Sequence, residues 1–206
     1  RRVLFRSNKK ITSIIFDCFG VLADPVLSYW YRDNYLNLGL VDAELEATLR
    51  RFDLGELTED DIFDRFSKYE GITATRDEIR KQTDLYMKLN KELIKVIRGL
   101  RTNGYQIVLL SNANHSFFDR KIFAEFPDFK ELFDYIVISS QVKMVKPDPE
   151  IYLHTLEKVG KRPDESIFID DNSKNVETAE NLGIHGHIFK DIGSLKEYFM
   201  SLDVRV

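Results

Sequence analysis

The chain has 206 residues, enough for one sizeable domain or for one domain with an insertion, and too few for a long repeat array. With 43% hydrophobic residues and a formal net charge of −4, it has the composition of a globular protein, which excludes a disordered chain and a strongly basic nucleic-acid-binding surface. Cys18 is the single cysteine, which excludes an internal disulfide, and no apolar run reaches the ~18 residues of a membrane span, so we expect a cytoplasmic protein that binds neither nucleic acid nor membrane.

The first residues of the chain need separate treatment. Residues 2–7 (RVLFRS) resemble the translated read-through of a common sequencing adapter. We therefore set residues 1–7 aside and begin at residue 8.

Short apolar runs along the chain are typical of strands that are buried on both faces. They cover residues 11–16, 105–110, 135–138, 167–169 and 185–189. Helical patterns alternate with them at residues 91–100, 150–159, 173–182 and 194–200. Because alternating strands and helices form right-handed crossovers, we predict an α/β fold with a Rossmann-like parallel sheet.

Between residues 22 and 90 the strand pattern is missing, and apolar and aromatic residues recur at helical spacing. Within this stretch, Thr58 followed by three acids is typical of a helix N-cap with negative charges in the first turn, and is a weaker candidate for a metal site. We therefore predict a Rossmann-like core of residues 8–23 and 89–206, with an all-helical cap inserted at residues 24–88.

Polar side chains follow the predicted strands at the points where the strands end. They are Asp17 after the first, Ser111 after the second, Lys146 in the loop after the third, and Asp170 and Asp171 after the fourth. Because the carboxyl ends of parallel strands meet at one edge of a sheet, we expect these side chains to converge. Three neighbouring carboxylates would repel one another unless a cation lay among them, and oxygen ligands without thiolates favour Mg²⁺.

A phosphoryl group would fit beside such an ion. The Ser111 hydroxyl, backbone N–H groups at Ser111 and Asn112, and the positive charge of Lys146 are suited to its equatorial oxygens. The sequence therefore indicates a phosphoryl-transfer site at this sheet edge.

The segments that carry these residues together resemble the four motifs of the haloacid dehalogenase-like (HAD) hydrolase superfamily, subfamily I with a helical cap. The motifs are DCFGVL, SN, KPDP and FIDDN, in that order, with the insertion after the first. The resemblance covers nearly the whole chain from Ile11. The segments LLSNANHSFF, KMVKPDPEIY and FIDDNSKNVETAENLG, with GELTEDDIFDRF in the insertion, are similar to the bacterial α-D-glucose-1-phosphate phosphatase branch.

This resemblance implies a Mg²⁺-dependent phosphomonoester hydrolase acting on a small phosphorylated metabolite such as a sugar phosphate. Asp17 would attack phosphorus to form an aspartyl-phosphate that water then cleaves. The metal ligands would be the Asp17 carboxylate, the backbone carbonyl of Phe19 and Asp171, with Asp170 in the same acidic cluster.

The resemblance also implies how substrate is held. Ser111 and Asn112 would bind the phosphoryl oxygens, and Lys146 would neutralise charge on the nucleophile and the phosphate. The cap would close over the site and exclude water. We expect a monomer or a homodimer whose partner is the small phosphorylated substrate.

Phe19 departs from the pattern of this superfamily, in which most phosphatases carry an acid two residues after the nucleophile. A phenyl ring cannot exchange a proton, and general acid–base catalysis is typically worth ~10² to 10⁴ in rate. We therefore expect slower hydrolysis or a substrate with a good leaving group. Asp24 and Glu56 are candidates for the proton donor.

Two other functions stay open. An aromatic residue at position 19 is also a feature of 2-haloacid dehalogenases, which use the same nucleophile without a metal, although Asp170 and Asp171 together make a metal-free site electrostatically unfavourable. The missing acid at Phe19 also leaves open a non-catalytic phosphate-binding regulatory protein.

Overall fold

The computed structural model describes residues 10–206, so the residues set aside above lie outside the described part of the chain. Its strands are β1 (Ser13–Phe16), β2 (Gln106–Ser111), β3 (Tyr135–Ile138), β4 (Ser166–Asp170) and β5 (His185–Ile188). Its helices are α1 (Val26–Asn34), α2 (Leu45–Asp53), α3 (Glu59–Ser67), α4 (Arg76–Asp84), α5 (Lys91–Thr102), α6 (His115–Phe117), α7 (Ser139–Val142), α8 (Pro149–Val159), α9 (Ser173–Asn181) and α10 (Ile192–Ser201). Tighter or wider turns form η1 (Leu36–Leu38), η2 (Phe118–Phe123), η3 (Pro127–Leu132) and η4 (Pro163–Glu165). Within residues 10–206, no helix combines the length and the apolar character needed to cross a bilayer.

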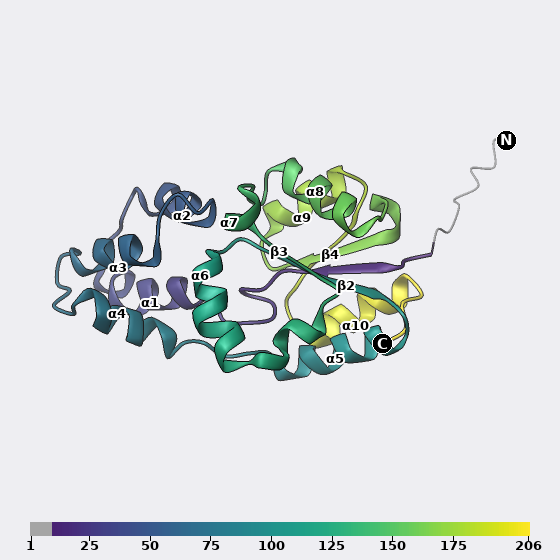
Figure 1. Ribbon diagram of the computed structural model, residues 1–206, viewed down its shortest axis with the longest axis horizontal. Coiled ribbons are helices and arrows are strands. Elements are labelled where there is room, and N and C mark those ends of the chain that lie inside the picture. The colour runs from purple at the N-terminus through teal and green to yellow at the C-terminus, as the bar shows by residue number, and fades with distance from the viewer. Residues whose placement is uncertain (1–9) are drawn as a thin grey trace.

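In this part of the chain, five parallel strands form one sheet in the order β3-β2-β1-β4-β5. Helices α8 and α9 cover one face and α5 and α10 cover the other (Figure 1). Side chains of β1 alternate between the two apolar clusters, with Ile14 and Phe16 on the α5 side and Ile15 on the α8 side. The predicted α/β fold with a Rossmann-like parallel sheet is therefore confirmed.

β3 has the predicted limits, and the limits of the other strands differ from the predicted ones by one or two residues. β1 begins at Ser13 rather than at residue 11, because its pairing with β2 and β4 begins at Ser13. Ile11 precedes the strand and is apolar because it packs in the core. β2 and β4 run one residue further than predicted, since Ser111 still pairs with Ile138 and Asp170 with Ile188. These two polar residues are therefore the last residues of their strands, and the sheet fixes their backbone positions.

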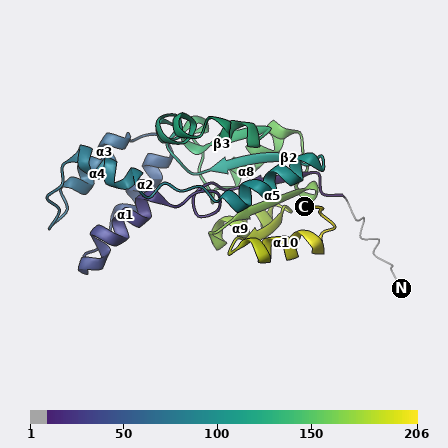
Figure 2. The same cartoon turned by 90° about the horizontal axis from the view of Figure 1, so that it is seen from below.

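Helices α1 to α4 pack around an apolar cluster of their own, beyond the end of the sheet (Figures 1 and 2). We call these helices and their connections the cap. Trp30 is fully buried there and stacks on Phe66 with ring centroids 4.9 Å apart. The apolar and aromatic residues that recur at helical spacing in the sequence form this cluster, and glycines separate the helices that carry them. The division of the chain at residues 24 and 88 stays a prediction.

The two segments that join the cap to the sheet run side by side. Ala23 forms an antiparallel bridge with Leu89, and the Asn90 N–H donates to the Leu22 carbonyl at 2.8 Å. Both segments leave from the edge at which β1 ends, so the cap is anchored directly above the carboxyl ends of the strands (Figure 1).

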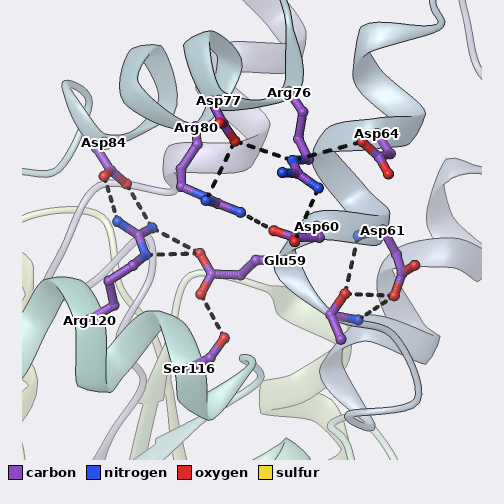
Figure 3. Close-up of polar contacts among 11 residues, drawn as sticks. Glu59, Asp60, Asp61, Asp64, Arg76, Asp77, Arg80, Asp84, Ser116 and Arg120 are labelled. Atoms are coloured by element: carbon purple, nitrogen blue, oxygen red, sulfur yellow. Dashed lines mark hydrogen bonds and ion pairs between the residues drawn. The ribbon is translucent and has the colours of Figure 1, made fainter.

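The acidic run after Thr58 begins α3, as predicted. Thr58 and Asp61 form a reciprocal capping box, in which the Thr58 hydroxyl accepts from the Asp61 N–H. Glu59 instead reaches the core, where it accepts from the Ser116 hydroxyl at 2.6 Å and pairs with Arg120 at 2.8 Å (Figure 3). These acids therefore stabilise a helix start and the boundary between cap and core.

Candidate active site

Carboxylates from two neighbouring strands meet at the sheet edge beneath the cap. Asp17 follows β1, Asp170 ends β4 and Asp171 comes next, and each offers an oxygen within 4.8 Å of those of the other two. Asp17 and Asp170 are buried, whereas Asp171 is exposed. The parallel register of β1 and β4, which pairs Phe16 with Ile169, produces this convergence.

Lys146 lies between two of these carboxylates. Its Nζ donates to Asp17 Oδ1 at 2.7 Å and to Asp170 Oδ2 at 2.6 Å. Burial lowers the pKa of Lys146, but the two carboxylates raise it by more, so that it lies above the ordinary lysine value. Lys146 therefore carries a permanent positive charge at the sheet edge.

Asn112 holds the backbone of Lys146 on both sides. Its Oδ1 accepts from the Lys146 N–H at 2.8 Å, and its Nδ2 donates to the Lys146 carbonyl at 2.8 Å. The side chain that the sequence places beside the phosphate is thus used to position the lysine, which leaves the backbone of Asn112 as the part suited to a phosphoryl group.

The pKa of Asp17 is raised above the ordinary aspartate value. Burial raises the pKa of Asp17, the charge of Lys146 lowers it, and the neighbouring Asp170 raises it again, with a net upward shift. A divalent cation at this carboxylate would favour the ionised form, which is the nucleophilic one.

Both carboxylate oxygens of Asp170 accept hydrogen bonds from other residues of the protein. Besides Lys146, it accepts from the Asn172 N–H at 2.8 Å and from Asn175 Nδ2 at 3.1 and 3.0 Å. Because both of its oxygens are engaged, it is the member of the acidic cluster least available to a cation. Its position supports a role in orienting Lys146.

Asn175 was missed by the sequence reasoning. It lies in the first turn of α9, where an asparagine signals nothing by itself, and it is buried only because that turn packs against the end of β4. The FIDDNSKN segment contains it, but the spacing alone gives it no role.

Gly20 makes close contact with Asp171. Its backbone has φ +92°, and a Cβ at this position would lie 2.3 Å from Asp171 Oδ2. A side chain there would displace the carboxylate, so glycine keeps Asp171 within reach of Asp17.

Ser111 and Phe19 complete the edge. The Ser111 hydroxyl is buried and has no hydrogen-bond partner among residues 10–206, so its bonding capacity is available to a ligand. The Phe19 ring packs edge-on against Phe117 and Phe118, at 5.7 and 6.0 Å. The Phe19 side chain therefore contributes apolar packing and cannot act as a proton donor.

Two cavities open at this edge in the described part of the chain. One, of about 150 Å³, is mainly apolar and lies between Phe19, Phe52 and Phe63. The other, of about 730 Å³, lies between α2 and the Lys146 loop. Neither is lined by Asp24 or Glu56, and Glu56 is exposed and pairs with Arg51 at 3.0 Å. The structure thus gives no support to these two candidate proton donors.

The acidic cluster suits a hard divalent cation. Its donors are carboxylate oxygens, and within residues 10–206 it is the one grouping of three His, Cys, Asp or Glu side chains close enough to hold a single ion. Asp17 and Asp171, together with the Phe19 carbonyl, are the groups that would hold Mg²⁺.

Comparison with known proteins gives consistent matches. The sequence pattern of the haloacid dehalogenase-like hydrolase family matches residues 11–183. D-ribitol-5-phosphate phosphatase of Bacteroides thetaiotaomicron is 28% identical over 189 residues, which cover 84% of this chain and 89% of that protein. A crystal structure of a HAD family enzyme from the same organism, the wild-type protein in complex with magnesium and inorganic phosphate, has a TM-score of 0.66 at 22% identity and covers 90% of this chain and 98% of that chain. At that identity, the likeness shows the fold.

Some matches are to much longer proteins. Bifunctional epoxide hydrolase 2 of Rattus norvegicus is 27% identical over 119 residues, which cover 57% of this chain. This chain spans about a fifth of the length of that relative, 22%.

Proposed function

Because this chain belongs to the haloacid dehalogenase-like hydrolases, we propose that it is a phosphatase that hydrolyses the phosphate monoester of a small phosphorylated metabolite, such as a sugar or polyol phosphate. The observation that carries the proposal is the meeting of Asp17, Asp171 and Lys146 at one sheet edge. The phosphatase relative that matches most of the chain supports the same reaction class.

In the proposed reaction, an Asp17 oxygen attacks phosphorus and the bond from phosphorus to the leaving oxygen breaks, which gives an aspartyl-phosphate. Water then attacks phosphorus, the bond to Asp17 breaks, and phosphate leaves. Lys146 neutralises charge on Asp17 and on the phosphoryl group, and the Ser111 hydroxyl donates to a phosphoryl oxygen. When bound by Asp17, Asp171 and the Phe19 carbonyl, Mg²⁺ would supply further neutralisation of the negative charge.

The larger cavity has side chains that would bind a sugar or polyol phosphate. Its lining includes charged and amide side chains from both cap and core: Arg50, Lys146, Asn172, Lys174 and Asn175. Such groups bind phosphate and hydroxyl oxygens. The similarity to a ribitol phosphate phosphatase supports this class, while the more specific resemblance to glucose-1-phosphate phosphatases stays a prediction.

The test is a phosphate-release screen of sugar phosphates, polyol phosphates, nucleotides and short acyl phosphates, with Mg²⁺ and with EDTA. We expect release with Mg²⁺ only, lost in Asp17→Asn and retained in Asp119→Asn, the same change at an exposed position of the core. Halide release from 2-chloropropionate in EDTA, with no phosphate release in Mg²⁺, would assign the dehalogenase reaction. Binding of BeF₃⁻ that requires Asp17, with no turnover of any ester, would assign a phosphate-binding protein.

A further inference from the structure

We propose that Asp53, the last residue of α2 in the cap, is the catalytic acid and base that Phe19 cannot be. This assignment rests on the proposed phosphatase function and deepens it. Asp53 would protonate the leaving alcohol in the first step and accept a proton from the attacking water in the second.

Asp53 lies where the two cavities adjoin. It lines the apolar cavity beside Phe19 and also the larger cavity beside Lys146. Leu49 and Asn112 are the other residues that line both. Lys146 and Asp53 line the larger cavity together, so a leaving group that extends into this cavity from a phosphoryl group held by Lys146 would pass Asp53.

Side chains of the core fix the segment that carries Asp53. The Ser139 hydroxyl donates to the Asp53 carbonyl at 2.6 Å, and Asn114 Nδ2 donates to the Leu57 carbonyl at 3.0 Å. Lys143 Nζ donates to the Leu54 and Gly55 carbonyls at 3.0 and 3.2 Å. Although Asp53 belongs to the cap, it is thus held at a defined place relative to the strand ends, as a proton donor must be.

The Asp53 carboxyl is also chemically available. It is only partly exposed, and it makes no hydrogen bond or ion pair within residues 10–206. The neighbouring Arg50 is directed to Asp148, at 2.6 Å. A partly buried carboxyl that is left without a partner is suited to proton transfer.

Its acidity suits the reaction. Burial raises the pKa of Asp53 to about 7, while the positive charges of Lys146 and Arg50 oppose that rise. Asp148 faces the same cavity and pairs with Arg50, which weakens the effect of Arg50. A group with a pKa near the working pH is protonated often enough to act as an acid and ionised often enough to act as a base.

Protons balance over the cycle. In the first step the Asp53 proton moves to the leaving oxygen as its bond to phosphorus breaks, which gives an alcohol and an Asp53 carboxylate. In the second step that carboxylate takes a proton from water as water bonds to phosphorus and the bond to Asp17 breaks. Asp53 ends protonated and Asp17 ends ionised.

Asp53→Asn tests the assignment through its dependence on the leaving group. For alkyl phosphates such as ribitol 5-phosphate, whose alcohol leaves poorly, we expect kcat/KM to fall by about 10² or more. For p-nitrophenyl phosphate, whose leaving group needs no proton, we expect kcat/KM to fall by less than about threefold, because that parameter reports the first step. The fall in alkyl phosphate kcat/KM that native enzyme shows as pH rises through about 7 should disappear in Asp53→Asn.

Controls separate this role from structure. Asp64→Asn makes the same change at a half-exposed cap residue and should match the native enzyme on both substrates. Asp53→Asn should fold at least as well as the native chain above pH 7, because it removes a carboxylate that is disfavoured when buried.

Equal losses on both substrates, or the same signature in Asp24→Asn instead, would overturn the assignment of Asp53 while leaving the phosphatase intact. Failure of the native protein to release phosphate from either substrate would overturn the proposed function and this assignment together.

Discussion

The core and the cap hold their charged residues in different ways. In the core, a fully buried Lys146 lies between two buried carboxylates at the end of an apolar sheet. In the cap, most charges lie at the surface or at the boundary with the core, as where Glu59 pairs with Arg120 and Arg120 with Asp84 (Figure 3). Buried charges cost free energy unless they are paired, so the buried charges of the core mark a chemical site, while the paired charges of the cap stabilise its helices and its contact with the core. Asp53 is the exception in the cap, because its carboxyl has no hydrogen-bond or ion-pair partner within residues 10–206.

The two regions also position their functional groups differently. Strand ends place Asp17, Ser111 and Asp170 through the backbone register of the sheet. Asp53 owes its place to side chains of the core that bind the carbonyls of its segment. The functional residues of the core are therefore predictable from local sequence patterns, whereas the contribution of the cap depends on tertiary contacts.

Lys146→Met should give the largest effect. It leaves Asp17 and Asp170 buried without their counter-charge, and breaking such a pair costs about 3–5 kcal/mol. We expect that loss in the free energy of unfolding measured with urea at pH 7, together with a fall in kcat of about 10² or more. The matched variant Lys143→Met removes hydrogen bonds to cap carbonyls and should cost about 1 kcal/mol. Equal destabilisation by the two variants would contradict the distinction between core and boundary.

Gly20→Ala should weaken Mg²⁺ binding by about 10-fold or more, because a Cβ there collides with Asp171 and groups that orient metal ligands typically carry effects of this size. Titration calorimetry with Mg²⁺ alone measures the change. Gly39→Ala in the cap is the control, since Gly39 also has a positive φ but no atom within 4 Å of its Cβ position. Equal Mg²⁺ affinity in the two variants would mean that Asp171 does not help to bind the ion.

Asp42→Asn should give the smallest effect and should confine it to the cap. Hydrogen bonds from Arg65 hold the pKa of Asp42 at about 2, against ~3.9 in an unfolded chain. After allowance for solvent around Arg65, this pair contributes about 1–2 kcal/mol above pH 4, and the contribution is lost as pH falls from about 4 to 2.

Hydrogen exchange checks this expectation. Cap amides should exchange faster in Asp42→Asn at pH 7 while core amides keep their protection, and the matched change at the exposed Asp33 should have little effect. Faster exchange throughout the sheet would contradict the separate stabilisation of the cap.

The sequence was sufficient for the parallel sheet, the strand-end residues and the family, and the match over residues 11–183 confirms the family. The strands and the residues that end them can be predicted because each is a short apolar run bounded by polar residues. The pairing of Asn112 with the Lys146 backbone, the turn of Asn175 toward Asp170 and the place of Asp53 could not be predicted. Each depends on how segments that are distant in the sequence pack, which leaves no signal in their own spacing.

The proposed mechanism requires that Asp17 becomes phosphorylated at this sheet edge. The direct measurement is a single turnover with Mg²⁺ and a phosphomonoester, quenched in acid at successive times and reduced with borohydride, followed by mass spectrometry of the peptide that contains residue 17. We expect residue 17 to be recovered in reduced form, as homoserine, at times before phosphate release is complete. Phosphate release at the native rate, with residue 17 recovered as unmodified aspartate at every time point, would show that Asp17 is not the nucleophile.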